Sequence, residues 1–173
     1  RFDKIYSGTL RRQIETAQGV NQFDLPHVKD ARLNEFDYFG LAHSLQVYNG
    51  IPLPTTQEEF AEQIKTILQY WKLGKISSPI ESFETFHVRI VQVVKELVQS
   101  DEKILVVSST GVIASLFGEL LDIELDHRIK LFLAVAHTSV HRFEILSGIL
   151  VPTLFGATPH LDNTEREHAR TFV

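Results

Sequence analysis

A short aliphatic segment that ends in small polar residues constrains the fold more than any other feature. Ile104-Leu105-Val106-Val107 is a continuous and mostly β-branched run, which is typical of a buried strand in a parallel sheet. Ser108-Ser109-Thr110-Gly111 follows at once, and a helix is expected from there to about Leu121. Such a strand that passes directly into a helix is the building unit of α/β proteins.

The start of the chain repeats this arrangement. Ile5 and Tyr6 form a short strand that ends at Ser7-Gly8-Thr9, and a helical pattern runs from about Leu10 to Ala17. In parallel sheets the carboxyl ends of strands lie at one edge, where ligands bind. We therefore expect the strand ends at Ser7 and Val107 to lie side by side.

The other elements complete an α/β pattern. Residues 20–37 are interpreted as a loop, and Thr55 or Thr56 is a candidate N-cap for a helix with an apolar stripe. Further predicted elements are a helix over 82–100 and two strands over 135–146 and 150–155. This alternation predicts an α/β fold, a three-layer α/β/α sandwich with a mainly parallel central sheet.

Composition narrows the class of protein. The 173 residues suit a single domain over 1–173. The net charge of −5 disfavours nonspecific binding of nucleic acid. No apolar run approaches the ~20 residues needed to span a membrane. The chain has no Cys, which excludes disulfides and thiolate chemistry but says little about the compartment. We expect a cytoplasmic protein.

Two helix starts carry residues suited to an anion. A helix N-terminus offers free N–H groups and positive potential, and Ser109 and Thr110 add hydroxyl donors. An ordinary N-cap would use the same residues. Arg11 and Arg12 lie in the first turn of the other helix, where a cation opposes the helix dipole unless an anion compensates it. Arg11 is the better candidate for a solvated residue and Arg12 for one that points inward.

The eight histidines give no sign of a metal site. His137 and His141 would face the same way on a strand but lie roughly 13 Å apart at ~3.3 Å per residue, too far to share an ion. No His-Glu-x-x-His string is present. We expect neither a metal nor a cofactor.

Several strings, in order along nearly the whole chain, resemble the histidine phosphatase superfamily, the phosphoglycerate mutase-like proteins. Tyr6-Ser7-Gly8-Thr9-Leu10-Arg11-Arg12-Gln13 resembles its Tyr-Ser-Ser-Pro-Leu-x-Arg-Ala motif, and Leu33-Asn34-Glu35-Phe36-Asp37 its Leu-x-Glu-x-Asp segment. Weaker similarities follow: Glu81-Ser82 with Phe86 and Arg89, Val106-Val107-Ser108-Ser109-Thr110-Gly111, His137-Thr138-Ser139-Val140, and Pro159-His160-Leu161.

The resemblance implies a phosphatase that hydrolyses a phosphomonoester through a phosphohistidine. Arg12, Ser7, Ser109 and Thr110 would bind the phosphate, and Arg12 and Glu35 would be catalytic, with Glu35 as the acid and base. The partners would be a phosphorylated small molecule or inorganic phosphate, with no nucleic acid and no membrane. A homodimer is possible along the strand near Val140.

Two departures from the family pattern keep an alternative open. The family's second active-site His falls on Ser109, a neutral donor instead of a charged one. Its nucleophile, the His of an Arg-His-Gly motif on the central strand, would lie before Arg1. Because the chain starts at Arg1 and contains no Met, either residues precede Arg1 or methionines have been lost from it. We expect preceding residues to supply that strand.

Three interpretations therefore compete. The first is a phosphatase whose nucleophile lies upstream of Arg1. The second is a weak or inactive relative that binds a phosphorylated ligand or a protein partner. The third, an unrelated α/β protein, requires the ordered strings to be coincidence.

Overall fold

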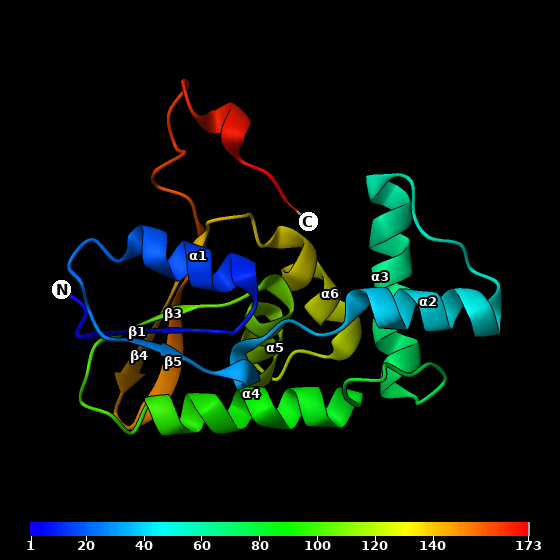
Figure 1. The fold of residues 1–173 in the computed structure, drawn as a ribbon, viewed down its shortest axis with the longest axis horizontal. Helices are drawn as coiled ribbons and strands as arrows, with labels where there is room; N and C mark the ends of the chain where they lie inside the picture. Colours follow the sequence, from blue (N-terminus) through cyan, green and yellow to red (C-terminus); the bar gives the residue numbers. More distant parts are fainter. Residues whose placement is uncertain (173) are drawn as a thin grey trace.

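Three short parallel strands form the sheet on which the candidate residues lie. The computed structural model describes residues 1–172 and orders the strands as β2 (His27–Lys29), β1 (Lys4–Ser7) and β3 (Ile104–Val107) (Figure 1). In β1 and β3, Ser7 lies opposite Val107. The prediction that these two strand ends lie side by side is confirmed.

Helices lie on both sides of this sheet. Helix α1 (Arg11–Val20) and helix α4 (Phe83–Leu97) run on opposite sides of β1 and β3 (Figure 1). Ser82 caps α4 by accepting a hydrogen bond from Thr85 N. The predicted α/β class with a mainly parallel central sheet is confirmed.

A hairpin forms a second, antiparallel sheet. Strand β4 (Val140–Leu146) pairs with β5 (Ile149–Ala157) across Ser147 and Gly148. Both turn residues have positive φ, 52° and 79°, as a two-residue hairpin turn requires. The hairpin packs on helix α5 (Thr110–Leu120), where Phe117 contacts Phe155 at 4.7 Å between ring centroids.

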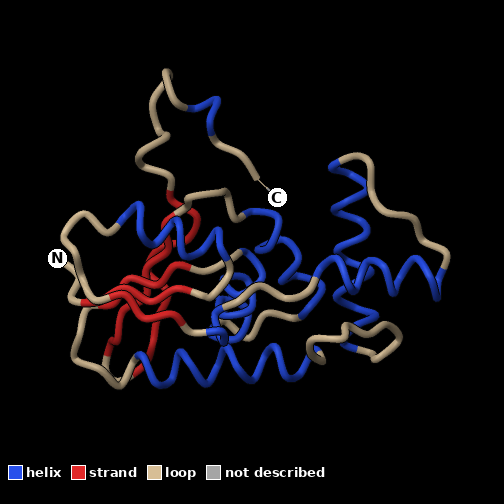
Figure 2. Tube along the Cα trace, in the orientation of Figure 1, coloured by secondary structure: helices blue, strands red, loops and turns tan. Residues whose placement is uncertain are grey.

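The main core lies between helices, to one side of the sheet. Figure 2 shows the strands gathered in one half of the molecule and several helices in the other. Those helices include α2 (Tyr38–Asn49), α3 (Gln57–Lys72), which Thr56 caps, and α6 (Leu125–Ala134). The buried side chains that they share with α4 and α5 include Leu41, Leu45, Ile64, Ile67, Trp71, Phe86, Ile90, Val112, Ile129 and Phe132.

The structure corrects the prediction in four places. Residues 20–37 contain β2 and a 3₁₀ turn (Ala31–Leu33), and α2 and α6 were not predicted. Helix α2 was missed because its own apolar residues lie on both its buried and its exposed faces, so the sequence shows no single apolar stripe. Residues 135–139 precede β4 and do not belong to it. Strand β3 is only partly buried, with Val106 40% exposed, because β1 is its one neighbour among the described strands.

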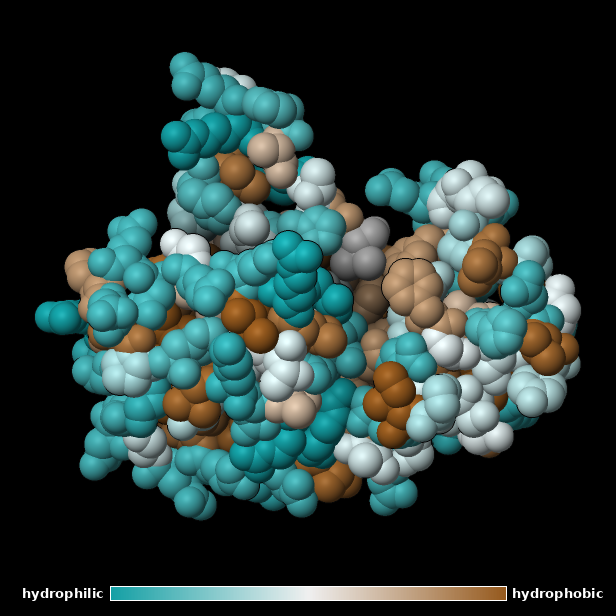
Figure 3. Space-filling model, in the orientation of Figure 1, coloured by the Kyte–Doolittle hydropathy of each residue, from teal (hydrophilic) through white to brown (hydrophobic). Residues whose placement is uncertain are grey.

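The surface over α2 and α3 carries more apolar side chains than that over α1. Figure 3 shows brown patches on the side of the molecule where α2 and α3 lie, and mainly teal over α1 (Figure 3). Phe39, Val47 and Tyr48 of α2 are all exposed. None of the helices within residues 1–172 is both long enough and apolar enough to cross a membrane.

Candidate active site

Glu35 lies at the amino end of α5, although 76 residues separate it from Gly111. Its Oε2 accepts a hydrogen bond from Gly111 N at 2.8 Å, and its Oε1 accepts one from Phe36 N at 3.0 Å. Asp30 sets up this approach by capping the 3₁₀ turn before it, where it accepts from Arg32 N. The buried Leu33 then fixes the chain that leads to Glu35.

The surroundings of Glu35 favour its protonated form. Burial raises the pKa of Glu35, while the N–H groups of Gly111 and Phe36 and the charges of Arg12 and Arg89 act in the opposite direction. Burial is the larger effect, because charge is costly in apolar surroundings. An apolar cavity of about 20 Å³ that adjoins Gly111 is lined by Phe36, Phe86 and Phe132, among others. Glu35 therefore has the raised pKa that a proton donor needs.

A partly buried ion pair holds the backbone on either side of Leu33. Arg89 on α4 pairs with Glu81 through two hydrogen bonds of 2.6 and 2.8 Å. Its remaining nitrogen, Nη1, donates to the carbonyl oxygens of Arg32 and Asn34 at 2.6 and 2.8 Å. One guanidinium thus satisfies a carboxylate and two carbonyls, and the segment before Glu35 is fixed to α4.

The two arginines of α1 differ in their partners. Arg11 forms an exposed ion pair with Glu15 at 2.7 Å. Arg12 is exposed, and its guanidinium makes no hydrogen bond or ion pair with any residue of the 1–172 segment. Its charge nevertheless acts on Glu35. Arg12 is therefore an exposed cation whose charge reaches Glu35.

Ser109 and Thr110 lie at the amino end of α5, where Ser109 contacts Gln13, the residue after Arg12. Ser109 is the N-cap, but its hydroxyl makes no capping hydrogen bond. It accepts instead from Gln13 Nε2 at 2.8 Å. Thr110 is the first helical residue and is partly exposed. The structure therefore brings Arg12, Glu35, Ser109 and Thr110 to one end of the sheet.

Ser7 is placed differently. Its side chain is fully buried, at 0% exposure. The hydroxyl lies 2.8 Å from Gly8 O, to which it donates, and 2.8 Å from His27 Nε2. Ser7 thus joins β1 to β2, and both contacts of its hydroxyl are with protein atoms.

Comparison with known proteins identifies the family of the chain. The model of the histidine phosphatase superfamily (branch 1) matches residues 1–152. The chain belongs to the histidine phosphatase superfamily. A search of curated protein sequences returned no match.

Solved structures share the fold of this histidine phosphatase family member at low identity. A phosphoserine phosphatase from Entamoeba histolytica, in complex with 3-phosphoglyceric acid, has a TM-score of 0.66 at 23% identity, over 92% of this chain and 76% of that one. The α-ribazole phosphatase of Shigella flexneri has a TM-score of 0.61 at 18% identity, over 91% of this chain and 74% of that one. A mycobacterial glucosyl-3-phosphoglycerate phosphatase, in complex with inorganic phosphate, has a TM-score of 0.56 at 19% identity, over 89% of this chain and 76% of that one.

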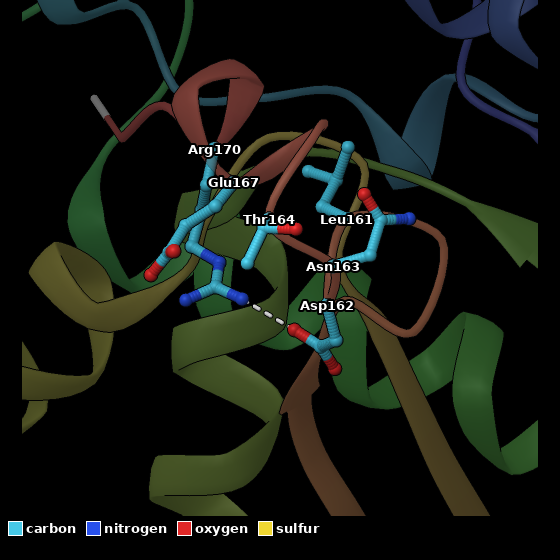
Figure 4. A pocket seen from close by; sticks show the side chains of 6 residues that line it. All are labelled: Leu161, Asp162, Asn163, Thr164, Glu167 and Arg170. Atoms are coloured by element: carbon cyan, nitrogen blue, oxygen red, sulfur yellow. Dashed lines mark hydrogen bonds and ion pairs between the residues drawn. The ribbon is translucent and has the colours of Figure 1, made fainter.

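A cavity of about 330 Å³ lies away from these residues, in the C-terminal segment. Figure 4 shows Arg170 pointing at Asp162, with which it pairs, and Glu167 beside them (Figure 4). Its remaining lining residues are Leu161, Asn163 and Thr164. Two carboxylates against one paired cation do not suit a phosphate, so this cavity is not the candidate site.

The histidines do not converge. His137 Nδ1 lies 2.9 Å from Thr171 Oγ1, whereas the His141 ring packs against Phe117 and Phe155. Burial lowers the pKa of His141 to about 4. Within residues 1–172, no three His, Asp or Glu side chains gather in a way that would hold a metal ion.

Sequence reasoning missed the supporting residues of the site. Gln13 and Arg89 were present in the strings that resemble the family, but neither received a role. Gly111 also received no role, yet it is the residue that lets Glu35 approach the helix: a Cβ there would overlap Glu35 Oε1 and lie 2.6 Å from the Phe36 ring.

Proposed function

We propose that this protein hydrolyses a phosphomonoester through a phosphohistidine intermediate. One observation carries the proposal: Glu35, a carboxyl group with a raised pKa, lies at a helix N-terminus within the electrostatic influence of Arg12, an exposed cation that pairs with none of residues 1–172. Proton donor, cation and N–H donors are the groups that phosphoryl transfer requires. Phosphatases that share the fold support this assignment.

The proposed reaction has two steps. In the first, a neutral histidine nitrogen attacks phosphorus, the P–O ester bond breaks, and Glu35 gives its proton to the leaving oxygen. In the second, water attacks phosphorus, the P–N bond breaks, and the Glu35 carboxylate takes the proton of the water. By the resemblance, this histidine belongs to an Arg-His-Gly motif in residues that precede Arg1.

Arg12 and the amino end of α5 bind the phosphate in this proposal. Arg12 presents a planar fork of N–H donors to two phosphate oxygens. Ser109 and Thr110 add hydroxyl and backbone donors. Ser7 contributes as a buried support for the turn, not as a direct ligand. The substrate is a phosphorylated small molecule; a homodimer along β4 and a cytoplasmic location stay predictions.

Two observations favour a second function, binding of a phosphorylated ligand without turnover. The serine at the place of the family's second histidine removes a positive charge from the site. The N–H of Gly111 is also bonded to Glu35 in this structure. Both features weaken the stabilisation of a transferring phosphoryl group.

Two adjacent arginines allow a matched test in the full-length protein. Arg12→Ala should lower kcat/KM on an aryl phosphate by about 100-fold or more, as the loss of a charge-stabilising donor does. Arg11→Ala, which removes only an exposed pair with Glu15, should stay within about twofold of wild type. Equal effects of the two variants would contradict the proposed site.

Turnover and binding are measured separately to decide between the two functions. Vanadate binding with measurable phosphatase activity supports the enzyme. Vanadate binding without turnover, in a protein whose residues before Arg1 lack Arg-His-Gly, supports the binding relative.

A further inference from the structure

We propose that Gln13 is a positioning residue that directs the hydroxyl proton of Ser109 toward the bound phosphate. The inference rests on the proposed phosphate site. It concerns a residue on α1 that acts through the N-cap of α5, Ser109, 96 positions away.

The orientation of the Gln13 amide follows from its partners. Leu33 O lies 3.0 Å from Nε2, and a carbonyl can only accept, so the amide nitrogen must face it. Leu10 N lies 3.4 Å from Oε1, and an amide N–H can only donate, so the oxygen must face it. The second proton of Nε2 then points at Ser109 Oγ, 2.8 Å away.

Ser109 is therefore an acceptor toward Gln13, and its own proton must point elsewhere. The ordinary use of an N-cap serine hydroxyl is as an acceptor for its own helix, and Ser109 makes no such bond. Glu35 takes that role by accepting from Gly111 N. No acceptor for the Ser109 proton is found among residues 1–172. Ser109 is partly exposed, so this proton can reach a ligand.

Gln13 is held firmly enough to set this direction. Its side chain is 2% exposed, and Gly8 provides the space, because a Cβ at position 8 would overlap Gln13 Oε1. Gln13 and Ser109 also depart together from the family strings, which have Ala and His there. A longer side chain at position 13 accompanies a shorter one at position 109, and the two meet in a hydrogen bond.

Gln13→Glu tests the direction of this bond with little change of shape. A carboxylate cannot donate, so it would accept the Ser109 proton and turn it away from the phosphate. We expect vanadate, measured by titration calorimetry, to bind at least about tenfold more weakly, because a hydrogen bond to a charged group is lost and the new carboxylate repels the anion. Gln13→Met, of similar size and with no donor, should weaken binding by about threefold, since a freely rotating hydroxyl still donates part of the time.

The decisive readout is the coupling to Ser109. In a Ser109→Ala background, Gln13→Met should leave vanadate affinity unchanged within about twofold, because the group it acts through is gone. Gln13→Glu should lose less affinity there than in the Ser109 background, because only the repulsion between its carboxylate and the anion is left. Equal losses in both backgrounds would show that Gln13 acts on the fold, and would overturn the inference.

Failure of the proposed function gives a different result. If wild type binds vanadate but does not turn over, the phosphatase is excluded and the Gln13 variants still test the inference. If wild type does not bind vanadate, both are overturned.

Discussion

Glu35 and Gly111 are joined by a hydrogen bond of 2.8 Å in which an acidic side chain satisfies the amino end of α5. Ser109, the residue expected to cap that helix, is bonded to Gln13 instead. The helix dipole favours the ionised carboxyl group and burial favours the neutral one. Burial is the larger effect and raises the pKa of Glu35, as a group that first gives and then takes a proton requires.

The approach of Glu35 to α5 depends on a glycine at position 111. In Gly111→Ala the new Cβ would overlap Glu35 and lie 2.6 Å from a carbon of the Phe36 ring, which packs on Phe86 and Trp71. We expect a loss of about 1–3 kcal/mol in the free energy of unfolding and a large fall in kcat. Urea unfolding and steady-state kinetics measure the two effects.

Gly19 supplies the matched control for this substitution. It lies in α1, and a Cβ there would meet nothing within 4 Å. Gly19→Ala should therefore stabilise the protein by about 0.5–1 kcal/mol, as alanine does in a helix, with kcat unchanged. A Gly111→Ala variant as stable and active as wild type would contradict the placement of Glu35.

The upward shift of the Glu35 pKa predicts how kcat and stability change with pH. Its neutral form donates the proton, so kcat should fall as pH rises through a midpoint above the ordinary value of 4.5. Glu35→Gln should slow turnover, remove this limb and spare vanadate binding. A raised carboxyl pKa also gives stability that is full below 4.5 and is lost as pH rises through the raised value. Relative to Glu35→Gln, wild type should therefore be more stable to urea at about pH 4 than at about pH 7.

Arg89 should be more important for stability than its place outside the reaction suggests. Its side chain is 15% exposed and that of its partner Glu81 is 6% exposed. Arg89→Met leaves a carboxylate and two carbonyls without this donor. We expect the free energy of unfolding, measured in urea, to fall by about 3–5 kcal/mol. Adding Glu81→Gln should restore part of this loss, because the unpaired charge is removed. Arg11→Met, which breaks an exposed pair, should leave the melting temperature unchanged.

A histidine at position 109 should need space at position 13. Ser109→His adds the positive charge that the site lacks and should strengthen vanadate binding. Gln13 Nε2, however, lies 2.8 Å from Ser109 Oγ, where an imidazole would crowd it. We expect Ser109→His combined with Gln13→Ala to bind vanadate more tightly than either single variant. Weaker binding by the double variant than by Ser109→His alone would contradict this arrangement.

The sequence by itself determined the elements whose signals are local. The strand at 104–107 and the helix with its cap at Thr55 or Thr56 depend on near neighbours in the sequence. The structure has the strand as β3 and the helix as α3, with Thr56 as its cap. The order of short strings identified the family and placed Arg12, Glu35 and Ser109 on it. Helices α2 and α6 were missed because tertiary contacts, not a clear stripe, decide which of their faces are buried.

Only the tertiary structure decided which groups satisfy one another. In the sequence Ser7 resembles Ser109, and Arg11 resembles Arg12. In the structure Ser7 is buried against His27, and Arg11 is paired with Glu15. Gln13 meets Ser109 and Glu35 meets Gly111 across 96 and 76 residues. Because a hydrogen bond depends on atoms lying about 3 Å apart with a donor facing an acceptor, no local pattern contains it.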